Sequence, residues 1–373
     1  MRIGINALYL IPGGVGGTEI YLRSLLGALT RIDDRNEYIV FINRESDGNL
    51  QLDSPRFRAI PCAVNARSRP HRILWEQMAF PVLLKKHPID VLFNPGFTMP
   101  LLFRGPSVTV FHDLQHKRHP EFFRWFDLPF WNLLLWAATR RSDSLIAVSD
   151  ATADDLERYY PGVASKTVVI PHGVDPEFFL IGKRRAEPAS PVQDDKYLLT
   201  VSTLHPHKNL DRLLEAFKLF RSNHPDFRLV VAGLKGFAAA ELEVLRRELG
   251  LTEFVTFTGW IPRAGLYHLF EYADAYIAPS RFEGFGMPIV ESLAAGIPSA
   301  CSGIPPLSQI AGPAAAQFDP ESVPAIAAAM ELITTDAAFR ARASIAGPER
   351  AREFDWNTTA ARTLAQIERS ARG

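Results

Sequence analysis

Residues 197–220 read YLLTVSTLHPHKNLDRLLEAFKLF, and this stretch decides the fold class. Its first five residues are a short, mostly apolar run, which is typical of a buried strand. From Leu210 to Phe220, leucine and phenylalanine recur at intervals of three and four residues, and this spacing predicts one apolar face of a helix. A strand that leads directly into a helix is the repeating unit of parallel α/β sheets, so the stretch predicts that architecture.

The same alternation of apolar runs and helical patterns continues along the whole chain. We therefore expect an α/β fold of two doubly wound, Rossmann-like domains that face a central cleft, with ligands at the carboxyl ends of the strands. Besides Tyr197–Val201, the expected strands are Ile3–Leu8, Tyr38–Ile42, Val91–Phe93, Val108–Phe111, Leu145–Val148, Val168–Ile170, Arg228–Ala232, Val255–Phe257, Ala275–Ile277 and Pro298–Cys301.

A stretch of low apolar content separates the two series of strands. Residues 178–196 hold the run Gly182–Arg185, two prolines and several acidic side chains, which is typical of a linker. The predicted N-terminal domain covers residues 1–177 and the predicted C-terminal domain residues 197–353.

The composition is that of a globular protein. The chain has 373 residues, 47% of them hydrophobic, which excludes general disorder and fits two domains. Because 41 basic residues balance 41 acidic ones, no net charge attracts nucleic acid, and no nucleic-acid partner is expected. Two cysteines, Cys62 and Cys301, are too few for a disulfide framework or a zinc cluster, which favours a reducing compartment.

Neither a secretory signal nor a membrane-spanning segment is expected. The apolar run at residues 1–6 is too short for a signal peptide. The uncharged stretch 292–318 contains four prolines, which no single spanning helix would tolerate. We therefore expect a cytoplasmic protein.

A glycine-rich loop, PGGVGGTE at residues 12–19, follows the first predicted strand and precedes a predicted helix. Bare backbone amides at a helix N-terminus favour an anion such as phosphate, although a flexible turn would have the same composition. The loop departs from the dinucleotide-binding pattern, because Glu19 stands where a third glycine is required and the second strand ends in Asn43.

Histidines follow the strand predicted at Val108–Phe111. His112 lies at its carboxyl end, where ligand-binding residues gather, so we predict that it belongs to the site. His112 and His116 have the i,i+4 spacing of metal ligands, but the run leaves a strand and the glutamate of H-E-x-x-H is missing. His116 and His119 are therefore interpreted as solvated loop histidines, and neither a metal nor a cofactor is expected.

Three charged residues in the C-terminal half carry the clearest signals. Lys208 directly precedes a helix, where its ammonium and the helix dipole would meet one diphosphate; an ordinary surface lysine is the alternative. Glu283 lies in a glycine-rich loop, and Glu291 lies in the opening turn of the helix that Pro288 is expected to start. Carboxylates accept paired hydroxyls, which fits a sugar and a ribose, whereas Glu291 would otherwise only favour the helix start.

Several motifs of other enzyme classes do not occur. The sequence has no G-x-x-x-x-G-K-[ST], no D-x-D and no G-x-S-x-G. These absences argue against a phosphate-loop kinase, a transferase that holds its nucleotide sugar through a metal, and a serine hydrolase.

The segment EGFGMPIVE at residues 283–291 closely resembles the E-x7-E signature of family 4 glycosyltransferases. The resemblance covers nearly the whole chain and includes the glycine-rich loop, His112-Asp113, Val148-Ser149-x-x-Thr152, Ile170–Asp175 and His207-Lys208-Asn209. It implies the GT-B fold and a retaining, metal-independent transfer from a nucleotide diphosphate sugar.

The resemblance also implies roles for single residues. Lys208 would neutralise the diphosphate, Glu283 would hold the donor sugar, and Glu291 would bind the ribose. His112 would lie beside the reacting sugar carbon, and the segment 255–261 would lie near the base. Catalytic roles thus fall on His112, Lys208 and Glu283, and donor binding on Gly16, Gly17, Ser202, Lys208, Trp260, Ile261, Glu283, Gly284, Phe285, Gly286, Met287 and Glu291.

One position departs from the family. Many members carry an arginine six residues before the lysine, and this chain has Ser202 there. Either Arg281 or His207 supplies the second cation, or the glycine-rich loop takes a larger share in stabilising the diphosphate.

The variant His207-Lys208-Asn209 looks most like bacterial polysaccharide mannosyltransferases, which points to GDP-mannose. A UDP-sugar donor, a noncatalytic sugar-nucleotide binder, an epimerase and a phosphorylase are the alternatives, and the last two lack support in the sequence.

The acceptor is expected to be a glycan or a polyprenyl-linked sugar. Residues 122–136 are rich in aromatic side chains, which favours core packing or, alternatively, a helix that leans on a membrane. The basic cluster Arg67–Arg72 would suit anionic headgroups. By the same resemblance, the helix expected in residues 354–373 should return to pack on residues 1–175.

Overall fold

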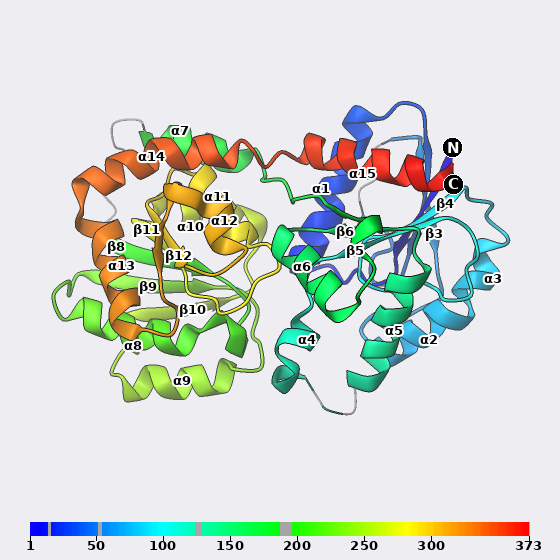
Figure 1. Cartoon of the computed structure of the whole chain (residues 1–373). Helices are drawn as coiled ribbons and strands as arrows, with labels where there is room; N and C mark the ends of the chain where they lie inside the picture. Colours follow the sequence, from blue (N-terminus) through cyan, green and yellow to red (C-terminus); the bar gives the residue numbers. More distant parts are fainter. Residues whose placement is uncertain (14–15, 51–53, 124, 126–127, 187–195, 373) are drawn as a thin grey trace. The chain divides into compact units, whose positions relative to one another are not determined.

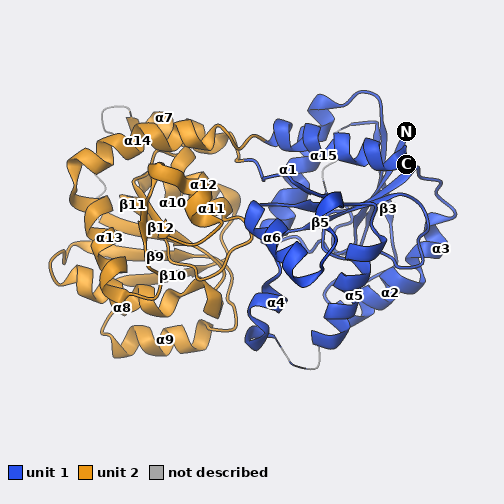
Figure 2. Cartoon of the chain, viewed as in Figure 1, with its two compact units in different colours: residues 1–173, 356–373 blue, residues 174–355 orange. Residues whose placement is uncertain are grey.

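A computed structural model describes the chain except for residues 14–15, 51–53, 124, 126–127, 187–195 and 373. Figure 1 shows its helices and strands. The chain divides into two compact units, drawn in separate colours in Figure 2. Unit 1 comprises residues 1–173 and 356–373, and unit 2 comprises residues 174–355.

Unit 1 is built on a parallel sheet whose described strands follow the order β3-β2-β1-β4-β5-β6-β7. The strands are β1 (Arg2–Ala7), β2 (Glu37–Ile42), β3 (Phe57–Pro61), β4 (Val91–Asn94), β5 (Ser107–Phe111), β6 (Ser144–Ala147) and β7 (Thr167–Val169). The helices are α1 (Gly17–Ile32), α2 (Arg69–Met78), α3 (Phe80–Leu84), α4 (Gln115–Arg118), α5 (Leu128–Arg141), α6 (Asp150–Tyr159) and α15 (Trp356–Ala371). Central strands β4 and β5 are buried along their whole length, as expected for a sheet covered on both faces.

The last helix, α15, belongs to unit 1 although it follows unit 2 in the sequence. It packs against α1, and the Thr359 hydroxyl donates a hydrogen bond to the carbonyl oxygen of Pro171 at 2.8 Å. Gly173 has no room for a side chain, because a Cβ there would lie 2.4 Å from the backbone nitrogen of Trp356. Glycine is therefore required where the chain leaves unit 1.

Unit 2 has a second parallel sheet, whose described strands follow the order β10-β9-β8-β11-β12-β13. They are β8 (Lys196–Val201), β9 (Phe227–Ala232), β10 (Val255–Gly259), β11 (Ala275–Ala278), β12 (Ser299–Ser302) and β13 (Ala316–Phe318). The helices are α7 (Glu177–Ala186), α8 (Leu210–Arg221), α9 (Ala239–Glu248), α10 (Arg263–Tyr272), α11 (Met287–Ala294), α12 (Leu307–Ala311), α13 (Val323–Thr335) and α14 (Ala337–Ala351). Strand β8 leads through the short helix η3 (Pro206–Lys208) into α8, as the opening stretch predicts.

The linker predicted at residues 178–196 is wrong for its first half. Residues 177–186 form α7, and Phe178 and Ile181 are fully buried in unit 2. The Phe178 ring packs edge-on against Phe270, with 4.9 Å between centroids. These two apolar residues, three positions apart, anchor this short helix, whereas the charged run Lys183–Arg185 that follows favoured the linker interpretation. Residues 187–195 lie outside the described part.

The domain boundaries also differ from the predicted ones, because α7 belongs to unit 2. Unit 2 begins at Val174, before the predicted boundary at 177, and ends at Asp355. The backbone nitrogen of Val174 donates to the carbonyl oxygen of Phe354 at 2.9 Å, so the chain enters and leaves this unit at adjacent points. Among the helices that the structure describes, none is long and apolar enough to cross a membrane.

Candidate functional site

An ion pair joins the two charged residues that the sequence placed on separate loops of unit 2. The Lys208 ammonium lies 2.6 Å from Oε1 of Glu283, and both side chains are about five-sixths buried, with 17% exposure each. The Ser280 hydroxyl donates to the same Glu283 oxygen at 2.7 Å. The pair lies at the carboxyl ends of the adjacent strands β8 and β11, where ligands bind in such sheets.

Asn209 holds these two loops together. Its backbone is left-handed, with φ of 57°, which asparagine tolerates better than most residues. Its fully buried side chain donates to the carbonyl oxygens of Pro279 at 3.0 Å and Pro320 at 2.8 Å. The backbone nitrogen of Arg281 also donates to the carbonyl oxygen of His207 at 2.8 Å. These bonds fix the position of Lys208 relative to the loop of Glu283.

Gly286 shapes the start of α11. Its φ of 99° is a conformation that other residues avoid, and a Cβ would lie 2.5 Å from the Leu307 side chain. The backbone amides of the first turn of α11 therefore begin directly after a residue that must be glycine. Such amides, together with the helix dipole, favour an anion.

One small pocket of unit 2 brings several predicted residues together. Its walls include Ser202, Lys208, Ser280, Glu283 and Gly286. The Ser202 hydroxyl oxygen is buried and has no hydrogen-bond partner among the described residues. A serine in place of the family's arginine thus leaves a polar atom in this wall rather than a second cation.

Glu291 lies deeper than the sequence indicated. It is in the second turn of α11, not the opening turn, and only 4% exposed. Its Oε1 accepts a hydrogen bond from Arg263 at 3.1 Å. Burial raises the pKa of the Glu291 carboxyl, and the Arg263 guanidinium opposes that rise.

Arg263 bridges two carboxylates. It donates to Asp175 at 3.2 Å as well as to Glu291, and the Tyr267 hydroxyl forms a short hydrogen bond with Asp175. Burial acts to raise the pKa of Asp175, but the bonds from Tyr267, the Glu177 backbone and Arg263 hold it below its ordinary value. Arg263 therefore holds the Glu291 carboxylate in place through a hydrogen bond to one of its two oxygens.

The other predicted donor residues of unit 2 spread along the same edge of the sheet. Trp260, 56% exposed, and Ile261, half-buried, follow β10, two strands away from β8. Gly284 and Phe285 are buried, and Phe285 packs edge-on against Phe354 with 5.7 Å between centroids. Met287 is the first residue of α11.

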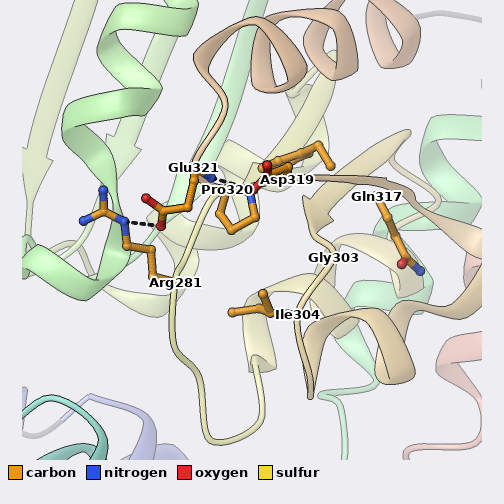
Figure 3. Close-up of a pocket in the computed structure, with 8 residues that line it drawn as sticks. Arg281, Gly303, Ile304, Gln317, Asp319, Pro320 and Glu321 are labelled. Atoms are coloured by element: carbon orange, nitrogen blue, oxygen red, sulfur yellow. Dashed lines mark hydrogen bonds and ion pairs between the residues drawn. The ribbon is translucent and has the colours of Figure 1, made fainter.

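A larger pocket of about 560 Å³ lies at the carboxyl ends of β12 and β13 (Figure 3). Its walls include Arg281, Ile304, Gln317 and Glu321. Arg281 forms an ion pair with Glu321 at 2.9 Å, drawn as a dashed line in Figure 3. The side chain expected as an alternative second cation beside Lys208 is therefore engaged elsewhere.

His112 lies in unit 1, at the carboxyl end of β5, and is 7% exposed. Its Nε2 lies 2.8 Å from the carbonyl oxygen of Pro95. Because a carbonyl oxygen can only accept a hydrogen bond, Nε2 must carry the hydrogen and donate it. Its Nδ1 is buried without a hydrogen-bond partner among the described residues. Burial lowers the pKa of His112 to about 4, so the ring is neutral and Nδ1 is an acceptor.

The glycine-rich loop also belongs to unit 1. Gly17 is the first residue of α1, and Gly16, with φ of 60°, precedes it. No atom lies within 4 Å of a Cβ built at either position, so the loop is open there. Glu19 accepts a hydrogen bond from the backbone nitrogen of Gly13 at 2.8 Å. Residues 14 and 15 lie outside the described part.

The interpretation of His116 as a solvated histidine is wrong. Its side chain is only 4% exposed, and its Nε2 lies 3.3 Å from the Tyr160 hydroxyl. His119 lies 3.0 Å from Glu121 and is partly exposed. In the residues that the structure describes, no group of three or more His, Cys, Asp or Glu side chains is arranged to hold a metal ion.

Sequence models of two families match the chain. Residues 15–178 match "Glycosyltransferase Family 4", and residues 183–350 match "Glycosyl transferases group 1". The chain is a family 4 glycosyltransferase. The resemblance inferred from residues 283–291 is thus confirmed for both units.

Curated relatives of this glycosyltransferase have different named activities. An O-antigen chain mannosyltransferase B of Escherichia coli is 27% identical over 286 residues, which span 74% of this chain and 73% of the relative. A glycogen synthase of Mycobacterium tuberculosis is 29% identical over 283 residues, 75% of this chain and 66% of the relative.

Solved structures confirm that the glycosyltransferase has the GT-B fold. Sucrose-phosphate synthase of Thermosynechococcus elongatus is similar with a TM-score of 0.80 at 20% identity, covering 99% of this chain and 98% of that one. HepE of Anabaena, in complex with UDP and glucose, has a TM-score of 0.75 at 20% identity and 99% coverage of both chains.

Sequence reasoning missed two charged residues of this glycosyltransferase, the partly exposed Arg263 and the buried Glu76. Arg263 lies in the first turn of α10, where the helix dipole disfavours a cation, and that mismatch was a signal that a carboxylate partner existed. Glu76, on α2 of unit 1, is 2% exposed and accepts bonds from Asn6 at 2.8 Å and Thr98 at 3.0 Å. Its signal was an acid on the apolar side of a helical pattern.

Proposed function

We propose that this glycosyltransferase moves a hexose, mannose from GDP-mannose, to a glycan or lipid-linked acceptor, with retention of configuration and without a metal ion. The Lys208–Glu283 pair at the ends of β8 and β11 carries the proposal. The mannosyltransferase relative of E. coli supports mannose as the donor sugar. Two free, buried cysteines support a reducing, cytoplasmic location.

Lys208 and Glu283 each retain binding capacity beyond their mutual bond. An ammonium has three donors, so one bond to Glu283 leaves two for phosphate oxygens. Glu283 uses Oε1 for Lys208 and Ser280, and its Oε2 is then available to a sugar hydroxyl. The pair therefore fits the junction between a diphosphate and a hexose.

Glu291 would bind the ribose by the same logic. Its Oε1 accepts from Arg263, and its other oxygen is left to accept paired ribose hydroxyls. Trp260 and Ile261 would lie near the base. In unit 1, Gly16 and Gly17 would offer amides to phosphate, and Nδ1 of His112 would accept a hydrogen bond from a sugar hydroxyl.

The reaction is proposed as a front-face displacement. The bond between the anomeric carbon and the diphosphate breaks, the sugar becomes oxocarbenium-like, and the departing phosphate oxygen takes the proton of the attacking acceptor hydroxyl. Negative charge grows on the diphosphate, where Lys208 and the amides of Phe285, Gly286 and Met287 would stabilise it. Orientation of the donor and the acceptor accounts for the remaining rate enhancement.

A donor panel tests the proposed function. Purified chain is incubated with GDP-mannose, GDP-glucose, UDP-glucose or UDP-galactose, and release of the nucleoside diphosphate is measured with and without candidate acceptors. We expect release from GDP-mannose only, together with a rise in melting temperature with GDP but not UDP. Release of the nucleoside diphosphate from a UDP-sugar only would show that the donor is not GDP-mannose. Nucleotide binding without release in the presence of any acceptor would favour a noncatalytic binder.

Chelation tests the proposed metal independence. We expect the release rate in EDTA to equal the rate in Mg²⁺ or Mn²⁺, because Lys208 and the helix amides would supply the positive charge that a cation supplies elsewhere. A loss of turnover in EDTA that Mn²⁺ or Mg²⁺ restores would contradict this part of the proposal.

A further inference from the structure

Unit 1 carries large apolar side chains on the solvent side of neighbouring helices. A helix that covers a sheet normally turns polar residues outward. Here α2 and α3 expose Leu74 by 63%, Met78 by 62% and Val82 by 56%, whereas Ile73 and Phe80 are buried. Helix α5 likewise buries Leu134 and Leu135 and exposes three large apolar residues at intervals of three: Phe130, Leu133 and Trp136.

These helices lie side by side. The connections β3 to β4 and β5 to β6 advance in the same direction along the sheet, so right-handed crossovers put α2 and α5 on the same face. At one end, the Arg69 guanidinium lies over the Trp131 ring, 4.1 Å from its centroid. At the other end, Gln77 bonds to Leu101, and Arg141 donates to the carbonyl oxygen of Phe103. Figure 1 shows α2, α3 and α5 together.

The exposed residue Leu102 lies in the loop that both helices contact. We call this surface the α2–α5 face. Its exposed apolar side chains are Leu74, Met78, Val82, Leu102, Phe130, Leu133 and Trp136.

Carboxylates are scarce within the segments that form this surface. Residues 65–89, 95–106 and 128–142 are all described, and their only carboxylate is Glu76, which is buried. The same segments hold eight lysine and arginine residues, seven of them exposed: Arg67, Arg69, Lys85, Lys86, Arg104, Arg140 and Arg141. A chain with no net charge thus concentrates positive charge around an exposed apolar surface.

We propose that the α2–α5 face docks on an anionic lipid bilayer. Exposed tryptophan, phenylalanine and leucine would enter the boundary between headgroups and acyl chains, and the surrounding lysine and arginine side chains would pair with lipid phosphates. The absence of exposed acid from these segments favours a uniformly negative partner over a protein surface with mixed charges. Binding to a bilayer would bring unit 1 to a lipid-linked acceptor, but the docking itself does not depend on the proposed reaction.

Vesicle flotation with the full chain tests the proposal directly. Vesicles of phosphatidylcholine alone are compared with equal mixtures of phosphatidylcholine and phosphatidylglycerol, in the absence of any sugar donor. We expect flotation with the mixed vesicles only, and weaker binding at high salt. Failure to float with mixed vesicles, or equal flotation with both kinds, would overturn the proposal whatever the enzyme's activity.

Two pairs of substitutions locate the contact. Leu133→Ser with Trp136→Ser should reduce partitioning more than tenfold, because both apolar side chains leave the bilayer. Lys85→Ala with Lys86→Ala should reduce it about twenty-five-fold, at about fivefold for each charge. Matched controls in unit 2, Leu219→Ser with Ile345→Ser and Lys218→Ala with Arg247→Ala, also change exposed side chains and should bind like wild type.

The same variants distinguish a bilayer from a second copy of the chain. If the α2–α5 face joined two copies, Leu133→Ser with Trp136→Ser would turn dimers into monomers in sedimentation velocity, and the wild type would not bind vesicles. That result would overturn the proposal. Because the substituted side chains are about half exposed, we expect unchanged circular dichroism and melting temperature for the variants.

Discussion

At the scale of single residues, the Lys208–Glu283 pair connects two tasks that the sequence assigned separately. Glu283 Oε1 receives both the Lys208 ammonium and the Ser280 hydroxyl. Loss of Lys208 removes a positive charge, whereas loss of the Ser280 hydroxyl removes one hydrogen bond and leaves the ion pair in place. The two substitutions therefore separate stabilisation of the leaving group from positioning of Glu283.

Lys208→Ala should lower kcat about 100-fold or more, because the charge on the diphosphate grows as the glycosidic bond breaks. Ser280→Ala should lower kcat less than about tenfold, because a single neutral donor is lost. Steady-state kinetics of donor cleavage measure both. A Lys208→Ala enzyme with near-normal kcat would mean that other groups stabilise the leaving diphosphate.

Arg263 matters because it opposes the protonation of a buried carboxylate. Burial raises the pKa of Glu291, and the Arg263 guanidinium at 3.1 Å opposes this rise. Without the arginine, burial and the nearby Asp175 carboxylate both raise the pKa of Glu291, so that it becomes protonated at a higher pH. A protonated Glu291 would accept hydroxyls less well.

Arg263→Met should therefore make donor binding depend on pH. As the pH falls, KM for the donor should rise at a higher pH in Arg263→Met than in wild type, while kcat changes little, because the ribose is held equally in ground and transition states. KM measured across the pH range provides the check. Parallel pH profiles of KM for the two proteins would show that Arg263 does not govern the charge of Glu291.

At the scale of elements, two helix starts offer backbone amides next to glycine, but their glycines differ in what they permit. At α11, Gly286 is demanded by its φ of 99° and by the Leu307 side chain. At α1, the fold does not require glycine at position 17, because an added Cβ would meet nothing within 4 Å. A glycine that the fold does not need is explained if a ligand approaches its backbone closely.

Gly17→Ala should leave the protein as stable as wild type or more stable by about 0.4–1 kcal/mol, because alanine restricts the unfolded chain. It should also raise the donor KM about tenfold, because the methyl group keeps phosphate from the amides. Gly27→Ala, within the same helix, is the control and should stabilise without changing KM. Chemical denaturation and kinetics measure both effects; an unchanged KM for Gly17→Ala would remove the loop from the donor site.

At the scale of the whole molecule, the sequence predicted both sheets except for one edge strand in each. All eleven expected strands occur, but β3 and β13 were not predicted, and each lies at the edge of its sheet. Strand β3 exposes Arg58 and Ala59 and ends in Pro61, so it lacks a continuous apolar run. Helix α15 was predicted from the near-helical spacing of Trp356, Leu364 and Ile367, which are buried, whereas the apolar residues of α7 form the continuous run Phe178–Ile181, which shows no helical spacing.

The site was predictable where a residue lies in the loop between a strand and the helix that follows it. Lys208 and Glu283 meet because strand ends of a parallel sheet share one edge. Pairing across helices was not predictable in this way: nothing in the local sequence connects Arg263 with Glu291, 28 positions apart. The burial of His116 was missed because a polar run after a strand resembles a loop, whereas tertiary packing against Tyr160 encloses it.

Enclosed histidines give unit 1 a distinct response to acid. Burial lowers the pKa of His112 to about 4 and that of His116 to about 4, and it also lowers the pKa of His172. In an unfolded chain, histidine titrates near 6.5. Between these values the unfolded chain binds more protons than the folded one, so the free energy of unfolding falls as the pH falls from about 6.5 to 4.

His116→Gln should reduce this acid sensitivity. Each buried histidine contributes up to about 1.4 kcal/mol per pH unit to the slope of the unfolding free energy in this window, and the substitution removes one such contribution. Glutamine also retains a donor for the Tyr160 hydroxyl, so the variant should fold at neutral pH. Urea denaturation between pH 4.5 and 7 would measure the slope, with His71→Gln, a substitution of an exposed histidine, as the matched variant. If His116→Gln kept the wild-type slope, the acid sensitivity would have to arise from other groups, and His116 would be free to take up a proton in the folded protein.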